Sequence, residues 1–186
     1  MTYEVNIGDL DYSYIFDENN YYFKQISEAD LFEKKMNECM MQSDCKSVKV
    51  LIKSQGGYAQ IAMDICNQIM QFEEKAKDKG IEIVGVIDTF TASGGSDIAF
   101  AFEKTVAKKY SLVMIHKTWT YVGNANSDLL KQQADILDKF DEIRKQIYKK
   151  KANLNDKQLS QIFNDKDVYL TPAELLEYGL IQSIES

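Results

Sequence analysis

The sequence is poor in residues that break or cross-link a chain. Its 186 residues include one proline and nine glycines, which leaves little room for extended linkers. Its three cysteines, Cys39, Cys45 and Cys66, cannot all pair with one another, and their spacing matches no common zinc motif. We therefore expect reduced thiols, a cytoplasmic location and no bound metal.

Acidic residues outnumber basic ones, 29 to 22, and long apolar runs are scarce. The net charge is −7, whereas a nucleic-acid backbone attracts a basic surface. No apolar run approaches the length of a membrane span, and Met1–Val5 lacks the basic start of a secretory signal. We expect neither nucleic acid nor membrane among its partners. A hydrophobic content of 45% and a charged content of 27% are typical of a soluble globular protein. The length fits a single domain over residues 1–186.

Apolar periodicity predicts strands that alternate with helices. Ser27 and Asp30 form a capping-box pattern at the start of a helix, and Gly80 ends a later one. Strands that alternate with helices indicate an α/β protein with parallel strands. Short strands and turns are expected over 1–25, strands over 48–52, 81–87 and 111–115, and helices over 31–40, 58–80, 96–102 and 128–151.

The predicted helix over 128–151 is longer than a core of this size needs. Its apolar stripe recurs at steps of three and four residues. We expect part of that stripe to pack against another subunit, although an ordinary surface helix packed on its own domain gives the same pattern.

The chain contains one histidine, His116, which ends a predicted strand. Ser93 lies upstream on a turn of small residues, and Asp165 and Asp167 lie downstream. A serine hydrolase needs a nucleophile, a base and a carboxylate that holds the base. A lone histidine and a serine on a glycine turn are, taken singly, also compatible with structural roles. Their order along the chain favours the catalytic interpretation.

The segment Ser54-Gln55-Gly56-Gly57 joins a predicted strand to a predicted helix. Its two glycines let backbone N–H groups approach a ligand, as an oxyanion hole requires, although a simple turn has the same pattern. It is neither a P-loop nor a dinucleotide fingerprint. We therefore expect no cofactor. Thr91 occupies the first glycine position of a Gly-x-Ser-x-Gly elbow, so an α/β-hydrolase fold is unsupported.

Four segments of this chain together resemble a known family. They are Ser54-Gln55-Gly56-Gly57, Thr91-Ala92-Ser93-Gly94-Gly95, Met114-Ile115-His116, and Asp167-Val168-Tyr169-Leu170-Thr171 with Glu177-Tyr178-Gly179-Leu180-Ile181. In the same order they resemble four motifs of the Clp protease family of serine peptidases, which are Ser-Pro-Gly-Gly, Ala-Ala-Ser-Met-Gly, Met-Ile-His, and Asp-x-Phe-Leu-Ser with Glu-Tyr-Gly-Leu-Ile. Trp119 and the segment Gly123-Asn124-Ala125 further resemble phage and prophage Clp-like head-maturation proteases. The resemblance implies a Clp, or crotonase-like, α/β fold of repeated β-β-α units. It also implies a protruding handle helix, within a handle region over about 117–151.

Carried over residue by residue, the resemblance implies that Ser93 is the nucleophile, His116 the general base and Asp167 the carboxylate that orients it. The backbone N–H groups of Gly57 and Gly94 would form the oxyanion hole. Asp165 is a rival to Asp167, which is preferred because it has the family's spacing to the strand that follows.

Two residues depart from the family pattern. Gln55 stands in place of a proline, from which we expect a looser turn. Gly94 stands in place of a bulky residue, from which we expect a wider first substrate pocket.

The resemblance implies a serine endopeptidase that cleaves polypeptides inside a homo-oligomeric ring or double ring. It would act without ATP or with the help of an unfoldase, a Clp ATPase. Phage capsid or scaffold proteins are the implied substrates of the head-maturation branch. Two alternatives stay open. One is a Clp-like scaffold subunit that does not cut, and the other is an acyl-CoA hydratase or isomerase on the same fold.

Overall fold

The computed structural model describes residues 1–17 and 22–186, with side chains described for residues 1–11 and 27–186. The described strands are β1 (Thr2–Ile7), β2 (Tyr12–Asp17), β3 (Tyr22–Ser27), β4 (Ser47–Ser54), β5 (Glu82–Ala92), β6 (Thr105–Lys108), β7 (Leu112–Ile115), β8 (Val168–Leu170) and β9 (Ser183–Glu185). The described helices are α1 (Glu28–Met40), α2 (Ala59–Lys79), α3 (Gly94–Ala101), α4 (Ser127–Ala152), α5 (Asp156–Ile162) and α6 (Pro172–Glu177).

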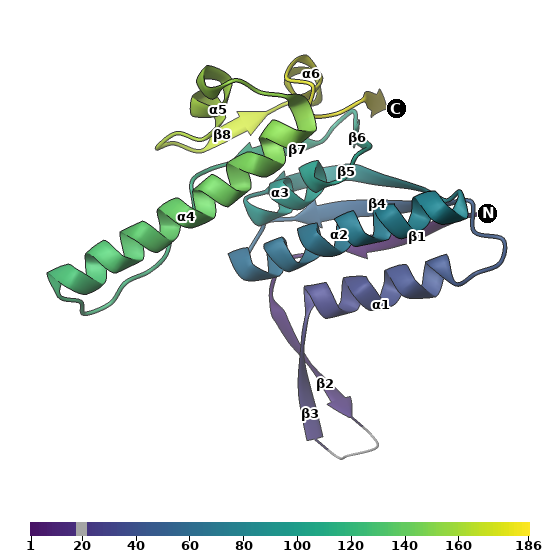
Figure 1. The fold of residues 1–186 in the computed structure, drawn as a ribbon, viewed down its shortest axis with the longest axis horizontal. Helices are drawn as coiled ribbons and strands as arrows, with labels where there is room; N and C mark the ends of the chain where they lie inside the picture. The colour runs from purple at the N-terminus through teal and green to yellow at the C-terminus, as the bar shows by residue number, and fades with distance from the viewer. Residues whose placement is uncertain (18–21) are drawn as a thin grey trace.

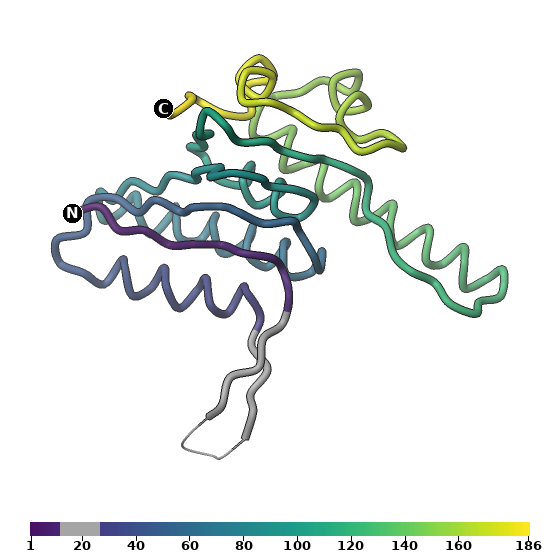
Figure 2. The backbone as a smooth tube through the Cα atoms, turned by 180° about the vertical axis from the view of Figure 1, so that it is seen from behind, coloured from purple at the N-terminus to yellow at the C-terminus, as the bar shows by residue number. Residues whose placement is uncertain are grey.

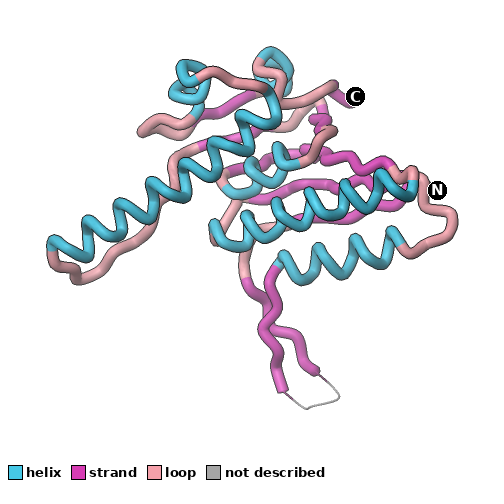
Figure 3. The backbone as a smooth tube through the Cα atoms, viewed as in Figure 1, coloured by secondary structure: helices cyan, strands magenta, loops and turns pink. Residues whose placement is uncertain are grey.

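A mainly parallel sheet is the centre of the fold, as Figure 3 shows in magenta. Strands β1, β4, β5, β6 and β9 lie side by side in that order, and all four pairs are parallel. Strand β7 pairs in parallel with the carboxyl end of β5, and β8 pairs antiparallel with β7. This mixed α/β architecture confirms the predicted fold class, including its parallel strands.

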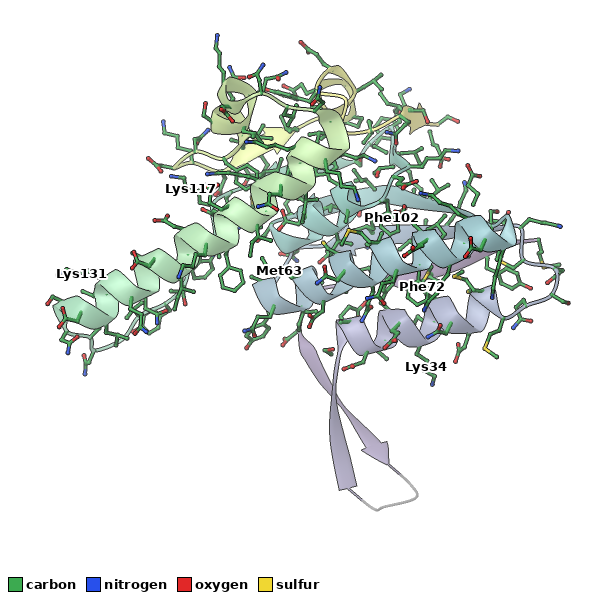
Figure 4. All side chains as sticks on the ribbon, in the orientation of Figure 1. Lys34, Met63, Phe72, Phe102, Lys117 and Lys131 are labelled. Carbon is green, nitrogen blue, oxygen red and sulfur yellow. The ribbon has the colours of Figure 1, made fainter. Side chains whose placement is uncertain are left out.

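Helices α1, α2 and α3 cover one face of this sheet, as the front and back views show (Figures 1 and 2). Helix α2 buries the apolar stripe that the sequence predicted, including Ile65 and Phe72. Phe72, labelled in Figure 4, meets the Phe32 ring of α1 edge to face at 6.0 Å. The predicted capping box is confirmed, since Ser27 and Asp30 exchange hydrogen bonds at the start of α1. Burial of these stripes holds the helices on the sheet.

The predicted long helix is confirmed as α4, and its first half extends away from the sheet (Figure 1). Its fully buried residues, Asp141, Arg144 and Tyr148, all lie in the second half. Leu130 and Ile143 keep about half of their surface exposed, at 51% and 48%. Lys131, labelled in Figure 4, lies near the outer end. The helix therefore packs on its own domain only along part of its length.

The N-terminal region contains strands, as expected. Strand β1 joins the main sheet, and β2 pairs antiparallel with β3. Residues 18–21, within the range 1–25 where short strands and turns were expected, lie outside the described residues. Within the described part of the chain, no helix combines the length and apolar character needed to cross a bilayer.

Candidate active site

Ser93 lies on the sharp turn between β5 and α3. Its backbone angles, φ of 55° and ψ of −127°, fall in a region that residues other than glycine rarely adopt. Such a conformation costs about 1–3 kcal/mol and persists only when its surroundings fix it. Here the Ser93 N–H donates to the Met114 carbonyl of β7 at 2.9 Å. Gly56 packs so closely that a Cβ at that position would lie 2.6 Å from Ser93 Cβ. The turn is therefore held from two sides.

His116 directly follows β7, whose pairing with β5 explains its position. Ala92 is the register partner of Met114, so the carboxyl ends of the two parallel strands meet at one edge. The pairing brings His116 Nε2 to 2.8 Å from Ser93 Oγ. Burial, and to a smaller extent the charge of Arg144, lowers the pKa of His116. The imidazole is therefore neutral near pH 7, the state in which it accepts a proton.

Asp167 directly precedes β8 and reaches His116 from the opposite side of the ring. The antiparallel register pairs Val168 with Ile115, which places Asp167 beside His116. Asp167 Oδ1 lies 3.8 Å from His116 Nδ1, beyond hydrogen-bond distance but within that of an ion pair. The rival Asp165 instead pairs with Lys117 at 2.7 Å. The structure thus brings Asp167, and not Asp165, to the imidazole.

The segment from Ser54 to Gly57 lies against Ser93. Gly57 has φ of 139°, and a Cβ there would lie 2.1 Å from the Leu10 carbonyl oxygen, so this position requires glycine. Leu10 N–H donates to the Gly56 carbonyl at 2.8 Å, and Tyr58 N–H donates to the Leu10 carbonyl at 2.9 Å. Within the described part of the chain, the N–H groups of Gly57 and Gly94 donate to no protein acceptor. Both are available to a ligand.

The structure shows what surrounds each of the two departures from the family motif. The Gln55 N–H, which a proline would lack, donates to Asp9 Oδ1 at 2.6 Å and ties the turn to the N-terminal segment. At Gly94, a Cβ would lie 2.8 Å from Leu10 Cδ1 and 3.0 Å from Ala62 Cβ. The expectation of a wider pocket at Gly94 is therefore wrong, because Leu10 and Ala62 occupy the space that a side chain would enter.

A groove of about 1260 Å³ contains Ser93, His116 and Asp167, together with Gly57 and Gly94. Its other walls come from residues 9–11, the start of α2, the segment after His116 and α4. The apolar and aromatic side chains of these walls include Tyr58, Met63, Trp119, Tyr121, Ile136, Leu137 and Phe140. Trp119 and Tyr121 are 72% and 88% exposed, so they offer large apolar surfaces to a ligand.

A buried polar cluster, which sequence reasoning missed, underlies the groove. Arg144 pairs with Asp97 of α3 at 2.7 Å and with Asp141 at 3.2 Å, and Tyr148 donates to Asp97 at 2.9 Å. A signal was present in the sequence. Asp141, Arg144 and Tyr148 recur at steps of three and four, so they share one face of α4.

The described residues contain no group of three or more His, Cys, Asp and Glu side chains arranged to hold a metal ion. The three cysteines are all free.

Two comparisons with known proteins relate most of the chain to a family. The model of the family described as Clp protease matches residues 12–186, a range that includes Ser93, His116 and Asp167. The chain is also similar to the ATP-dependent Clp protease proteolytic subunit 1 of Borreliella burgdorferi. The two are 25% identical over 145 residues, which cover 77% of this chain and 70% of that protein.

Proposed function

The chain belongs to the Clp protease family, a family of serine proteases, and we propose that it is an endopeptidase with a Ser93–His116–Asp167 triad. Ser93 Oγ attacks the carbonyl carbon of a peptide bond while its proton passes to His116 Nε2. The protonated imidazole then gives this proton to the leaving amine, which releases the first product and leaves an acyl-enzyme. Water, activated by the same imidazole, hydrolyses the ester and restores Ser93.

The backbone N–H groups of Gly57 and Gly94 serve as the oxyanion hole in this proposal. Both lack protein acceptors among the described residues and both line the groove. They donate to the negative oxygen of the tetrahedral intermediate. One such donor typically contributes about 3 kcal/mol to lowering the barrier.

One observation carries the proposal, namely the 2.8 Å contact between Ser93 Oγ and His116 Nε2. It joins a strained serine to the single histidine of the sequence, and the lowered pKa of that histidine suits a base. The alternative is a scaffold subunit without peptidase activity. Its basis is the 3.8 Å separation between Asp167 and His116, because a triad carboxylate normally accepts a hydrogen bond from its histidine.

Polypeptides are the substrates of the Clp protease family, whose members form oligomeric rings. We propose that residues 1–186 form one Clp-like domain that assembles into a homo-oligomeric ring or double ring. The handle region, residues 117–151, supplies a contact between subunits, since α4 leaves the apolar side chains of Leu130 and Ile143 about half exposed. An extended peptide adds as a strand beside the segments that follow Gly57 and His116.

The finer biological role is also a proposal. Trp119 and the segment Gly123-Asn124-Ala125 favour a phage or prophage head-maturation protease in the cytoplasm. Its substrates would be capsid or scaffold proteins. Such a protease acts without ATP or with a Clp ATPase as its unfoldase.

A fluorophosphonate probe tests the proposal, because it phosphonylates an activated serine. We expect wild-type protein to gain one probe per chain, at Ser93, with peptide mapping as the readout. Ser43→Ala, a change at an exposed serine in a turn, is the matched control and should be labelled like wild type. An unlabelled wild-type protein that assembles normally would favour the scaffold alternative. Turnover of an acyl-CoA thioester without labelling would favour the hydratase or isomerase.

A further inference from the structure

Arg144 occupies an unusual place, because it lies buried beneath the active site although it belongs to α4. Its side chain is 4% exposed. Nε donates to Asp97 Oδ2 at 2.7 Å, and the Asp97 side chain is equally buried. Asp97 lies one helical turn after Ser93 on α3. This ion pair therefore ties α4 to the helix that begins at the nucleophile.

A second nitrogen of the same guanidinium contacts the segment that carries the base. Arg144 Nη1 donates to the backbone carbonyl of His116 at 2.8 Å and lies 3.1 Å from Thr118 Oγ1. Asp141 adds to this contact, since its Oδ1 accepts from the Thr118 N–H at 2.8 Å and from the Thr118 hydroxyl at 2.7 Å. The chain just after β7 is thus held by two side chains of α4.

Stability alone does not explain the cluster. Removing charged groups from water is costly, and an apolar replacement of similar volume is often neutral or stabilising. Arg144 Nη2 has no hydrogen-bond partner in the described part of the chain, which adds to the cost. What the planar guanidinium supplies is geometry, because its fixed fork of donors holds two groups at a set separation.

We propose that Arg144 is a positioning residue for the Ser93–His116 pair. It holds the His116 backbone on one side and the Ser93 helix, through Asp97, on the other. The distance between Ser93 Oγ and His116 Nε2 therefore depends on how α4 packs on the domain. The inference rests on the proposed function, since it assigns Arg144 a role toward the nucleophile and base named there.

The charges that face His116 come from three elements. Asp97 lies on α3, Asp141 and Arg144 on α4, and Asp167 on the segment before β8. Arg144 opposes the three carboxylates, which favour the protonated imidazole. Replacing Arg144 with an uncharged residue therefore favours protonation of His116. The acid limb of a pH–rate profile should move to higher pH in such a variant, which reports the action of the Arg144 charge on His116.

The test compares fluorophosphonate labelling rates at Ser93 across pH in assembled wild-type protein and two Arg144 variants. Arg144→Lys keeps the charge but loses the fork, and we expect labelling to slow by about 100-fold while the fold is kept. Arg144→Ala should be as slow, with its acid limb shifted to higher pH. Millimolar guanidinium, and not sodium chloride of equal ionic strength, should restore its rate. The control, Lys145→Met, removes a cation from the solvent side of α4 and should label like wild type.

Wild-type labelling separates the two hypotheses. If wild type is not labelled, the proposed function fails. If wild type is labelled and Arg144→Lys reacts equally fast, the positioning role is overturned. It is also overturned if guanidinium does not restore folded Arg144→Ala. Circular dichroism measures the unfolded fraction of each variant. If the loss of labelling equals that fraction, Arg144 only stabilises the fold, and the proposal is overturned as well.

Discussion

The Asp167 carboxylate lies 3.8 Å from Nδ1 of His116, about one ångström beyond a hydrogen bond, and its side chain is 52% exposed. On the other side of the ring, Nε2 already lies 2.8 Å from Ser93 Oγ. His116 is thus within hydrogen-bond distance of Ser93, whereas Asp167 is not within hydrogen-bond distance of His116. A small movement of the segment before β8 would complete the arrangement.

Replacing Asp167 tests whether that carboxylate acts on the imidazole. We expect Asp167→Asn to lower peptidase kcat/KM by up to about 10⁴-fold, the loss seen when a triad carboxylate becomes an amide. Asp165→Asn is the matched control, because that carboxylate pairs with Lys117 and lies two residues away. It should retain nearly full activity. Equal losses in the two variants would contradict the assignment of Asp167.

The pH dependence of activity follows from the lowered pKa of His116, caused first by burial and then by the charge of Arg144. The base works when neutral, so activity rises with pH as His116 loses its proton. We expect the midpoint of kcat/KM below about 6.5, the ordinary value for histidine. No other histidine in the sequence competes for this titration. A profile that stays flat between about pH 5 and 8 would argue against His116 as the base.

Two substitutions at Asp9 test the hydrogen bond that holds the segment from Ser54 to Gly57. Asp9→Ala removes the acceptor of the Gln55 N–H, so the segment that presents Gly57 loses one of its ties. We expect kcat on a peptide to fall by about tenfold, less than the loss of a whole oxyanion donor. Asp9→Asn keeps a side-chain oxygen and should recover most of the rate. Wild-type kcat in Asp9→Ala would show that the tie is dispensable.

Charges at two exposed apolar positions of α4 test the contact between subunits. Leu130→Glu with Ile143→Glu places carboxylates on apolar side chains that the domain itself leaves exposed. Burial of apolar surface stabilises association by about 25 cal/mol per Å², and the introduced carboxylates oppose that burial. We therefore expect analytical ultracentrifugation to show that the assembly splits. Gln132→Glu, at an exposed polar position, should leave the assembly intact. An unchanged large oligomer in the double variant, or a monomeric wild type, would exclude this role for α4. Leu137 and Phe140 are unsuitable here, because they line the groove.

The sequence allowed the positions of strong signals to be predicted. The strands before Ser93 and His116 are apolar runs, and α4 has a long helical period, so these elements were anticipated. The end of β5 was not, because the strand runs to Ala92, beyond the expected end at residue 87. Strands β6, β8 and β9 were missed, since three or four residues hold too little alternation to be recognised. The Asp97–Arg144 pair was missed because it joins residues 47 positions apart. The tie between Asp9 and Gln55 was missed for the same reason, and so was the packing of Leu10 against Gly94.

The most direct test of the central claim is the cleavage of an unfolded polypeptide, such as casein, by wild type and Ser93→Ala, with the products identified by mass spectrometry. Alanine removes the hydroxyl that forms the acyl-enzyme and is smaller than the serine that the turn already holds, so the variant should assemble normally. We predict internal cleavage by wild type and no cleavage by Ser93→Ala at the same oligomeric state. Full turnover by Ser93→Ala would contradict the assignment of Ser93 as the nucleophile.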